Sequence, residues 1–375
     1  MKGVRVLYFN TFLINMKIDF YISSLSGGGA EKVLTTLAKW FYEDGNDVSI
    51  ISLEKRPQFY QVQDGIKVIK YNNMRYGKIT GTIKDLCSIR TYLKNNKADV
   101  SISFLSRTNL LLILANLSLF LKHKIIVCDR NNPKKEHSKI IFAISNLLYS
   151  FATKIGVQTK QIKSFYPKFL QEKIVVVENP IDTRTLNEQI LENVIREKRI
   201  ISIGRLEPQK DFNTLILSFS KIAKKYPEWH LDIFGCGEMK DQLEKIIDNL
   251  DLKKRILLKG RTQKPYYELK KSSIFVLSSF YEGFPNVLCE AMYAENLCIS
   301  SNCVSGPKEL IDNGVNGWLF EIGKVEELTK LLDMAIRIHD SKKGEEIRSN
   351  AYNSVKRLYL DNIGNEWKKL IKSLI

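Results

Sequence analysis

The sequence lacks several patterns that define common protein classes. No apolar run reaches the ~18 to 20 residues of a membrane span; the longest, residues 110–121, is interrupted by Asn116 and Ser118. The six cysteines include no CxxC pair, so we expect reduced, buried thiols and a cytoplasmic protein. Low-complexity tracts and internal repeats are missing, and 375 residues suffice for two well-packed domains.

The first fifteen residues, "MKGVRVLYFNTFLIN", have a basic start but no small-residue cleavage site, which argues against a signal peptide. The next stretch, "MKIDFYISSL", has the character of an opening strand. This favours Met16 as the natural start of translation.

The charge is strongly positive. The chain has 58 Lys and Arg against 41 Asp and Glu, a formal charge of +17, which predicts an anionic partner. Residues 121–175 hold eleven Lys or Arg and only three Asp or Glu. Within them "HSKIIFAISNLLYSF" has apolar residues at helical spacing, namely Ile140, Ile144, Leu147, Leu148 and Phe151.

Basic and apolar residues together favour an anionic membrane surface as the partner of this stretch. The alternative is a helix that faces the core of a generally basic protein. No RNA-binding aromatic motif or helix-turn-helix pattern is present, so we expect no nucleic acid partner.

Apolar strand-like runs alternate with helical patterns, which is the βαβ rhythm of an α/β protein with parallel sheets. The first half contains "KIDFYISSL", "DVSIISL", "KVIKY", "DVSISFL", "KIIVCD", "KIGV" and "KIVVVEN". A polar connection at 179–199 is followed by "IISIGRL", "HLDIFGCG", "RILLKG", "SIFVLSS" and "LCISSN". We therefore predict two Rossmann-like domains, 1–182 and 183–375, facing across a cleft, with the last helices returning toward the first domain.

The stretch "SSFYEGFPNVLCEAM" sets Glu282 in a turn and Glu290 about two turns into the helix that follows, with Pro285 near the helix start. We expect the two carboxylates to stand roughly 10 Å apart, about the span from a hexose across a diphosphate to a ribose. The N–H groups of Phe284, Asn286 and Val287 at the helix start suit a phosphate.

Two cations, Arg205 and Lys210, follow a strand in "SIGRLEPQKDF" and could hold a diphosphate. The chain has no Asp-x-Asp pair, the usual carboxylate arrangement for a metal-bridged nucleotide diphosphate. We therefore expect the cations to act without a metal or cofactor. In the first half, Gly27 and Gly28 of "SLSGGGAEKVL" would let the backbone approach a ligand, although the spacing is not the GxGxxG of a dinucleotide site.

The motifs "GRLEPQKDF", "EGFPNVLCEAM" and "SGPKELIDNGVNGWLF", taken in order, resemble the retaining glycosyltransferases of family 4, which have the two-domain GT-B fold. The resemblance covers nearly the whole chain from Met16. It implies an acceptor-binding first domain and a nucleotide-sugar-binding second domain.

The resemblance also implies roles for individual residues. Arg205 and Lys210 would bind the nucleotide diphosphate, Glu282 the donor sugar hydroxyls and Glu290 the ribose. The remaining donor-binding residues would surround the sugar and phosphates or hold the base through backbone: Gly27, Gly28, Gly260, Arg261, Gly283, Phe284, Pro285, Asn286 and Val287.

The chain departs from the family at one point. Many members have a histidine near the donor sugar after the strand that corresponds to "KIIVCD", where this chain has "CDRNNP". Arg130 is the candidate replacement, and we expect His137 to be a solvated residue at a helix start. The "RNNP" and "SGPKEL" stretches resemble the members that build bacterial surface polysaccharides.

The resulting expectation is a retaining hexosyltransferase that moves a hexose or N-acetylhexosamine from a UDP-sugar to a lipid-linked saccharide at the cytosolic membrane face. Two alternatives stay open at this point. One is a UDP-sugar epimerase with the same fold, and the other is a non-catalytic basic protein that binds membranes or nucleic acid.

Overall fold

The computed structural model describes residues 15–130, 132, 138–190 and 194–375. The predicted start at Met16 depends on residues 1–14, which lie outside the described residues, as do Pro133, Lys134, Lys135 and His137. The chain forms two compact units. One takes in the described residues up to Cys128 with 144–155 and 367–375, and the other the described residues of 129–143 and 156–366. The domain boundary expected at 182 and 183 remains a prediction.

Among the described residues, one sheet has seven strands in the order β3-β2-β1-β4-β5-β6-β7. The central strands β1, β4 and β5 are buried along nearly their whole length, as parallel strands with covered faces are. All seven coincide with predicted strands. Their bounds are β1 Lys17–Ile22, β2 Asp47–Ser52, β3 Lys67–Lys70, β4 Val100–Phe104, β5 Ile125–Cys128, β6 Lys154–Val157 and β7 Ile174–Val176.

The helices that accompany this sheet are α1 Gly29–Glu43, α2 Lys78–Asn95, α3 Ser106–Ser118, α5 Lys139–Tyr149 and α6 Lys160–Lys163. The apolar stripe of α1 is buried, as its spacing predicts. The chain ends in α15, Leu360–Lys372, whose Trp367 and Ile371 are buried. In the first unit Lys368 Nζ of α15 donates a hydrogen bond to Asp44 Oδ1 over 2.8 Å.

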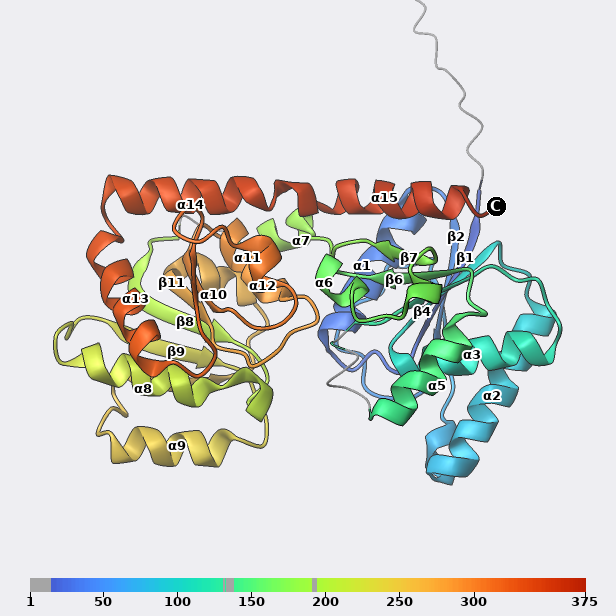
Figure 1. The fold of residues 1–375 in the computed structure, drawn as a ribbon, viewed down its shortest axis with the longest axis horizontal. Coiled ribbons are helices and arrows are strands. Elements are labelled where there is room, and N and C mark those ends of the chain that lie inside the picture. The colour runs from blue at the N-terminus through green and yellow to red at the C-terminus, as the bar shows by residue number, and fades with distance from the viewer. Residues whose placement is uncertain (1–14, 131, 133–137, 191–193) are drawn as a thin grey trace, which may run out of the picture. The chain divides into compact units, whose positions relative to one another are not determined.

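The second sheet has six strands among the described residues, in the order β10-β9-β8-β11-β12-β13. Figure 1 labels β8, β9 and β11 of this sheet. Five of them were predicted, and β13 was not. The bounds are β8 Glu197–Ile203, β9 His230–Phe234, β10 Ile256–Gly260, β11 Ser272–Leu277, β12 Leu297–Ser301 and β13 Trp318–Phe320. Neighbouring strands run parallel, so their carboxyl ends meet at one edge.

One face of the second sheet packs against α8 Phe212–Ala223, α9 Lys240–Asn249 and α13 Val325–Ile338 in a single apolar core. The other helices of this unit are α7 Thr183–Asn187, α10 Pro265–Lys271, α11 Asn286–Tyr293, α12 Pro307–Leu310 and α14 Lys342–Ser354. Parallel sheets with helices on their faces confirm the α/β prediction.

Two surface features differ from the sequence-based expectations. Cys87 and Cys236 are exposed, so the prediction that all cysteines are buried is wrong for these two. The apolar side of α5 faces solvent: Ile140 is 74% exposed and Leu147 62%, while the buried residues of the helix are Ser145, Asn146 and Tyr149. The core-facing alternative for this helix is therefore wrong.

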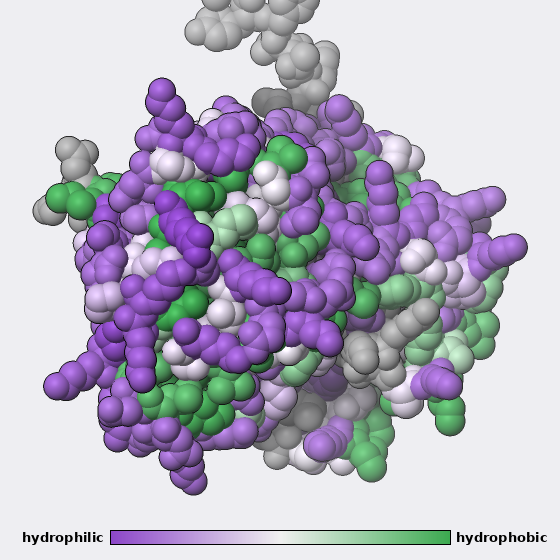
Figure 2. Space-filling model, turned by 60° about the vertical axis from the view of Figure 1, so that its left-hand side comes forward, coloured by the Kyte–Doolittle hydropathy of each residue, from purple (hydrophilic) through white to green (hydrophobic). Residues whose placement is uncertain are grey.

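The surface in Figure 2 is mostly hydrophilic, with smaller apolar areas between protruding side chains. None of the helices in the described part of the chain is both long and apolar enough to cross a membrane.

Candidate active site

Glu282 is the centre of a buried cluster at the carboxyl edge of the second sheet. β11 ends at Leu277, and the turn that carries Glu282 leads into α11. Glu282 Oε1 accepts hydrogen bonds from Lys210 Nζ and from Ser279 Oγ, each at 2.6 Å. Glu282 is only 6% exposed, and the two donors hold its carboxylate in one place.

Lys210 reaches Glu282 because the loop after β8 is bound to the loop after β11. The Phe280 N–H donates to the Gln209 carbonyl and Ser278 Oγ to the Lys210 carbonyl, both at 2.8 Å. The stem of Lys210 lies against Gly204, where a Cβ would come within 3.2 Å of it. The glycine of the "SIGRL" motif therefore leaves room for the lysine side chain.

Arg205 differs from Lys210 in its surroundings. Its side chain is 62% exposed, and Nη1 donates to Glu207 Oε1 over 2.8 Å. A guanidinium that accessible can change partner at little cost, because an exposed ion pair contributes only about 0 to 1 kcal/mol. Its role in donor binding remains a prediction.

Glu290 lies in α11 and is 8% exposed. It is the fifth residue of that helix, which begins at Asn286, so it stands just over one turn in and not two as predicted. Pro285 is the residue before the helix. The Asn286 N–H donates to the Phe284 carbonyl over 3.0 Å, and its contact with a phosphate remains a prediction.

The turn before α11 is fixed from the opposite side by the "SGPKEL" stretch. Ser305 Oγ donates to the Gly283 carbonyl over 2.8 Å. Gly306 has a φ of +102°, and a Cβ there would lie 2.3 Å from Pro285 Cδ. Only a glycine at position 306 leaves Pro285 where it is. This gives a steric reason for the glycine of the "SGPKEL" motif.

A hydrogen-bonded chain of three side chains reaches the start of α11. Arg130 Nη1 donates to Asn179 Oδ1 over 2.6 Å, and Asn179 Nδ2 donates to Asn286 Oδ1 over 2.8 Å. Arg130 was the predicted replacement for the family histidine, and it lies one hydrogen-bonded residue away from Asn286. Whether it meets the sugar remains a prediction.

The other predicted residues lie elsewhere. Gly260 ends β10 in a left-handed conformation, and its carbonyl accepts from the Gly235 N–H over 2.8 Å; Arg261 follows it. Gly27 and Gly28 lie in the first unit before α1. A Cβ on Gly27 would lie 2.8 Å from the ring of Phe59, and one on Gly28 would lie 2.4 Å from Glu31 Oε2.

Sequence reasoning missed Ser279, Asn179 and Ser305. Ser279 follows a buried strand at its carboxyl end, which is the one local signal available for it. The two partners of Asn179, Arg130 and Asn286, are 49 and 107 residues away, so no local pattern indicates it. In the part of the chain that the structure describes, no group of three or more His, Cys, Asp or Glu side chains could hold a metal ion.

Comparison with known proteins agrees with this geometry. Residues 27–185 match the family described as Glycosyltransferase Family 4, and residues 184–354 match Glycosyl transferases group 1. A Campylobacter jejuni protein named as an α-1,4-N-acetyl-D-galactosaminyltransferase acting on a GalNAc-GalNAc-diNAcBac-PP-undecaprenol substrate is 30% identical over 95% of this chain and 98% of its own.

Another relative, an uncharacterized glycosyltransferase of Haemophilus influenzae, is 30% identical over 85% of this chain and 90% of its own. Among solved structures, Anabaena HepE in complex with UDP and glucose superimposes with a TM-score of 0.80 at 19% identity, covering 96% of this chain and 100% of that one. The chain therefore belongs to the glycosyltransferases of the GT-B fold.

Proposed function

We propose that the enzyme is a retaining family 4 hexosyltransferase that moves a hexose or N-acetylhexosamine from a UDP-sugar to a lipid-linked saccharide in polysaccharide biosynthesis. The observation that carries this proposal is the buried contact of Lys210 with Glu282. An ammonium and a carboxylate at one point can bind the diphosphate and a sugar hydroxyl of the same donor molecule. The names of the relatives support it, because the Campylobacter protein acts on an undecaprenol-linked saccharide and the HepE structures hold UDP and glucose.

In the proposed reaction the bond from the sugar C1 to the diphosphate oxygen breaks, and a bond from C1 to the acceptor oxygen forms on the same face. The acceptor proton passes to the leaving diphosphate, and UDP is the second product. Arg205 and Lys210 stabilise the negative charge that grows on the leaving group, Glu282 holds the sugar and Glu290 the ribose. A preorganised group of this kind typically contributes about 2.7 to 4 kcal/mol to the transition state.

The exposed side of α5 supports peripheral contact with an anionic membrane at the cytosolic face. Five large apolar side chains, between 48% and 74% exposed, lie on this helix and just after it: Ile140, Ile141, Ile144, Leu147 and Phe151. They occur in residues 121–175, which hold eleven Lys or Arg against three Asp or Glu, and this combination is typical of helices that lie in a membrane interface.

The donor-site assignment is tested with Lys210→Met, Glu282→Gln and the double variant in a UDP-sugar hydrolysis and transfer assay. Each single variant should lose on the order of 100-fold or more in kcat/KM. The double variant leaves no unpaired charge, so it should fold like the wild type and remain inactive.

The matched control is Lys221→Met, because Lys221 forms an ion pair with Glu326 at an exposed site on α8 and α13. It should keep full activity. UDP should raise the melting temperature of the wild type and the control but not of the double variant. Activity of Lys210→Met within threefold of the wild type would show the site to be elsewhere.

A further inference from the structure

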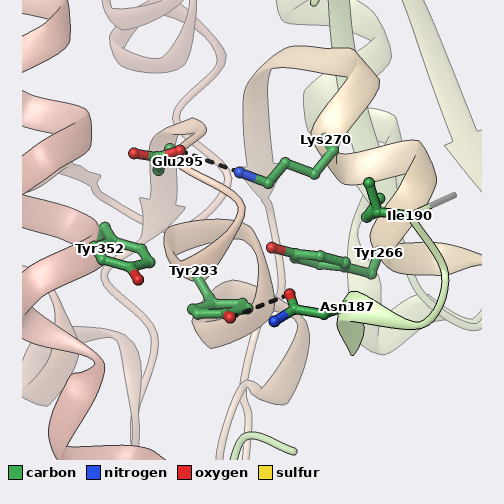
Figure 3. A pocket seen from close by; sticks show the side chains of 7 residues that line it. All are labelled: Asn187, Ile190, Tyr266, Lys270, Tyr293, Glu295 and Tyr352. Atoms are coloured by element: carbon green, nitrogen blue, oxygen red, sulfur yellow. Dashed lines mark hydrogen bonds and ion pairs between the residues drawn. The ribbon is translucent and has the colours of Figure 1, made fainter. Parts of the chain in front are cut away.

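A pocket of about 520 Å³ lies in the second unit, a size that accommodates a small molecule. It is at the opposite edge of the sheet from Glu282, because Lys270 and Glu295 stand just before the first residues of β11 and β12. Residues from or beside α7, α10, α11 and α14 surround the space (Figure 3). They are Asn187, Ile190, Tyr266, Lys270, Tyr293, Glu295 and Tyr352.

Three tyrosines, Tyr266, Tyr293 and Tyr352, are among the residues that line this pocket. Tyr266 and Tyr293 stack with ring centroids 5.5 Å apart, and Tyr293 and Tyr352 stack at the same distance. Since the rings pack on one another, they keep a rigid shape and present edges and hydroxyls. Figure 3 shows the Tyr266 hydroxyl pointing into the space that the seven side chains share.

The polar groups of the pocket include one positive and one negative side chain, and both hydrogen-bond donors and hydrogen-bond acceptors. Lys270 Nζ lies 3.1 Å from Glu295 Oε2, and Asn187 Oδ1 accepts from the Tyr293 hydroxyl over 3.2 Å. An anionic ligand would be repelled by the Glu295 carboxylate. A cationic ligand would be repelled by the Lys270 ammonium. A neutral ligand with many hydroxyl groups can bond to the ammonium, the carboxylate, the amide and the tyrosine hydroxyls together.

Glu295 occupies a backbone position that normally favours glycine. It follows α11 with a φ of +59°, and the N–H groups of Glu295 and Asn296 close the helix end on the carbonyls of Met292 and Ala291. Arg196 secures this turn by donating to the Glu295 carbonyl over 2.6 Å. The backbone that carries the Glu295 carboxylate is thus held by three hydrogen bonds.

Arg348 is a further unusual group near the pocket, one helical turn before Tyr352 in α14. Its Nε and Nη2 are buried and have no hydrogen-bond partner among the described residues. Burial, with the nearby charge of Arg196, lowers the pKa of this guanidinium to about 10, while the charges of Asp340, Glu345 and, least, Glu295 oppose that change. Arg348 does not line the pocket itself, so its buried donors are not among the groups that a ligand there would contact.

We propose that this pocket is a second saccharide-binding site, separate from the donor site, that holds one or two sugar residues of a glycan. The neutral, hydroxyl-rich character of the ligand follows from the pocket itself. The choice of a saccharide among such ligands rests on the proposed function, in which both acceptor and product carry glycans.

The test uses a disaccharide of N-acetylhexosamine as the probe and saturation-transfer NMR with the full-length protein as the readout. The wild type should show transfer to the probe, and it should persist in excess UDP and in Glu282→Gln. Glu295→Gly should weaken binding at least tenfold. Because glycine suits the left-handed backbone, this variant should keep or raise the melting temperature, whereas a purely structural role for Glu295 predicts a lower one.

Two further variants sharpen the result. Tyr352→Phe removes one hydroxyl and preserves the ring stack, so it should weaken binding, with a small loss of stability from the hydrogen bond to Tyr359. Glu346→Gln is the control, since Glu346 lies on the same helix outside the pocket and is exposed. It should bind the probe as the wild type does.

Each remaining outcome decides between the two proposals. Absence of binding to the wild type overturns the second site. Binding that is lost in Glu282→Gln but kept in Glu295→Gly places the sugar in the candidate active site and also overturns it. Binding that depends on Glu295 in a protein that fails to bind UDP leaves the second site standing and contradicts the proposed function.

Discussion

Asn179 Nδ2 lies 2.8 Å from Asn286 Oδ1, so a side chain in the segment after β7 fixes the first residue of α11. Asn179→Ala removes this bond and the one from Arg130, and we expect a kcat/KM roughly 10-fold below the wild type with a modest loss of stability, about 1 to 3 kcal/mol. Steady-state kinetics and thermal melting measure the two effects. Asn353→Ala, at an exposed asparagine of α14, is the control. Wild-type kinetics in Asn179→Ala would remove any positioning role for this residue.

Gly306 and Gly323 offer a matched pair for the turn before α11. Both have positive φ, but a Cβ at 306 meets Pro285 at 2.3 Å while one at 323 meets nothing within 4 Å. Gly323→Ala should lower the free energy of unfolding by only about 1 kcal/mol, because alanine disfavours the left-handed conformation. Gly306→Ala should lose more stability and most activity, because Pro285 has to move. Equal melting temperatures and activities for the two variants would contradict the steric explanation.

Arg199 holds a buried ion network in the second unit. Its Nη1 lies 3.1 Å from Asp232 Oδ2 and 2.9 Å from Glu268 Oε2. Arg199→Met leaves the Asp232 carboxylate buried without its cation, so it should reduce the free energy of unfolding by about 3 to 5 kcal/mol. Lys198→Met removes the adjacent exposed pair with Glu228 and should cost less than about 1 kcal/mol. Urea unfolding of both variants tests the contrast, which a similar loss in the two would refute.

Asp19 gives the first unit a pH-dependent stability. It is buried in β1, and burial raises the pKa of its carboxyl to about 6, although the Tyr92 hydroxyl bonds to it. A raised pKa stabilises the folded state fully below the unfolded value of about 3.9, and this contribution is lost as pH rises through about 6. The free energy of unfolding of Asp19→Asn should therefore exceed that of the wild type by up to roughly 3 kcal/mol at pH 8, and by little near pH 4. Denaturation at the two pH values measures it, and a pH-independent difference would exclude Asp19 as the source.

The exposed side of α5 predicts lipid dependence. Leu147→Asp should reduce binding to vesicles that contain anionic lipid by at least tenfold, because burying a leucine contributes about 1.5 to 3 kcal/mol. Leu217→Asp alters another leucine that is partly exposed, at 38%, on α8 and should leave vesicle binding unchanged. Flotation with anionic and with neutral vesicles separates the apolar from the electrostatic contribution. Equal binding by both variants would exclude α5 from the contact.

Most strands were predictable because a buried parallel strand reads as a short apolar run, as "SIFVLSS" does for β11. β13 was missed because the three apolar residues of Trp318–Phe320 directly follow Asn316 and Gly317, whereas the equally short β7 lies within the longer run "KIVVVEN". The motif around Glu282 gave its turn and its helix, but the Ser279 hydroxyl and the Asn179 amide act on partners that no local pattern reveals. For α5 the apolar spacing was evident from sequence. Which side of the helix faces solvent depends on the tertiary packing around it, and the local sequence does not reveal that packing.

The position of β1 between two parallel neighbours has a consequence for synthesis of the chain. β1 pairs with β2 and with β4, and the second pairing joins Ile18 to Val100. While the nascent chain emerges from the ribosome, one edge of β1 stays unpaired until β4 has been made. Open strand edges invite association with other chains. Fragments that stop before residue 100 should therefore aggregate, and this part of the protein should benefit from chaperones during translation.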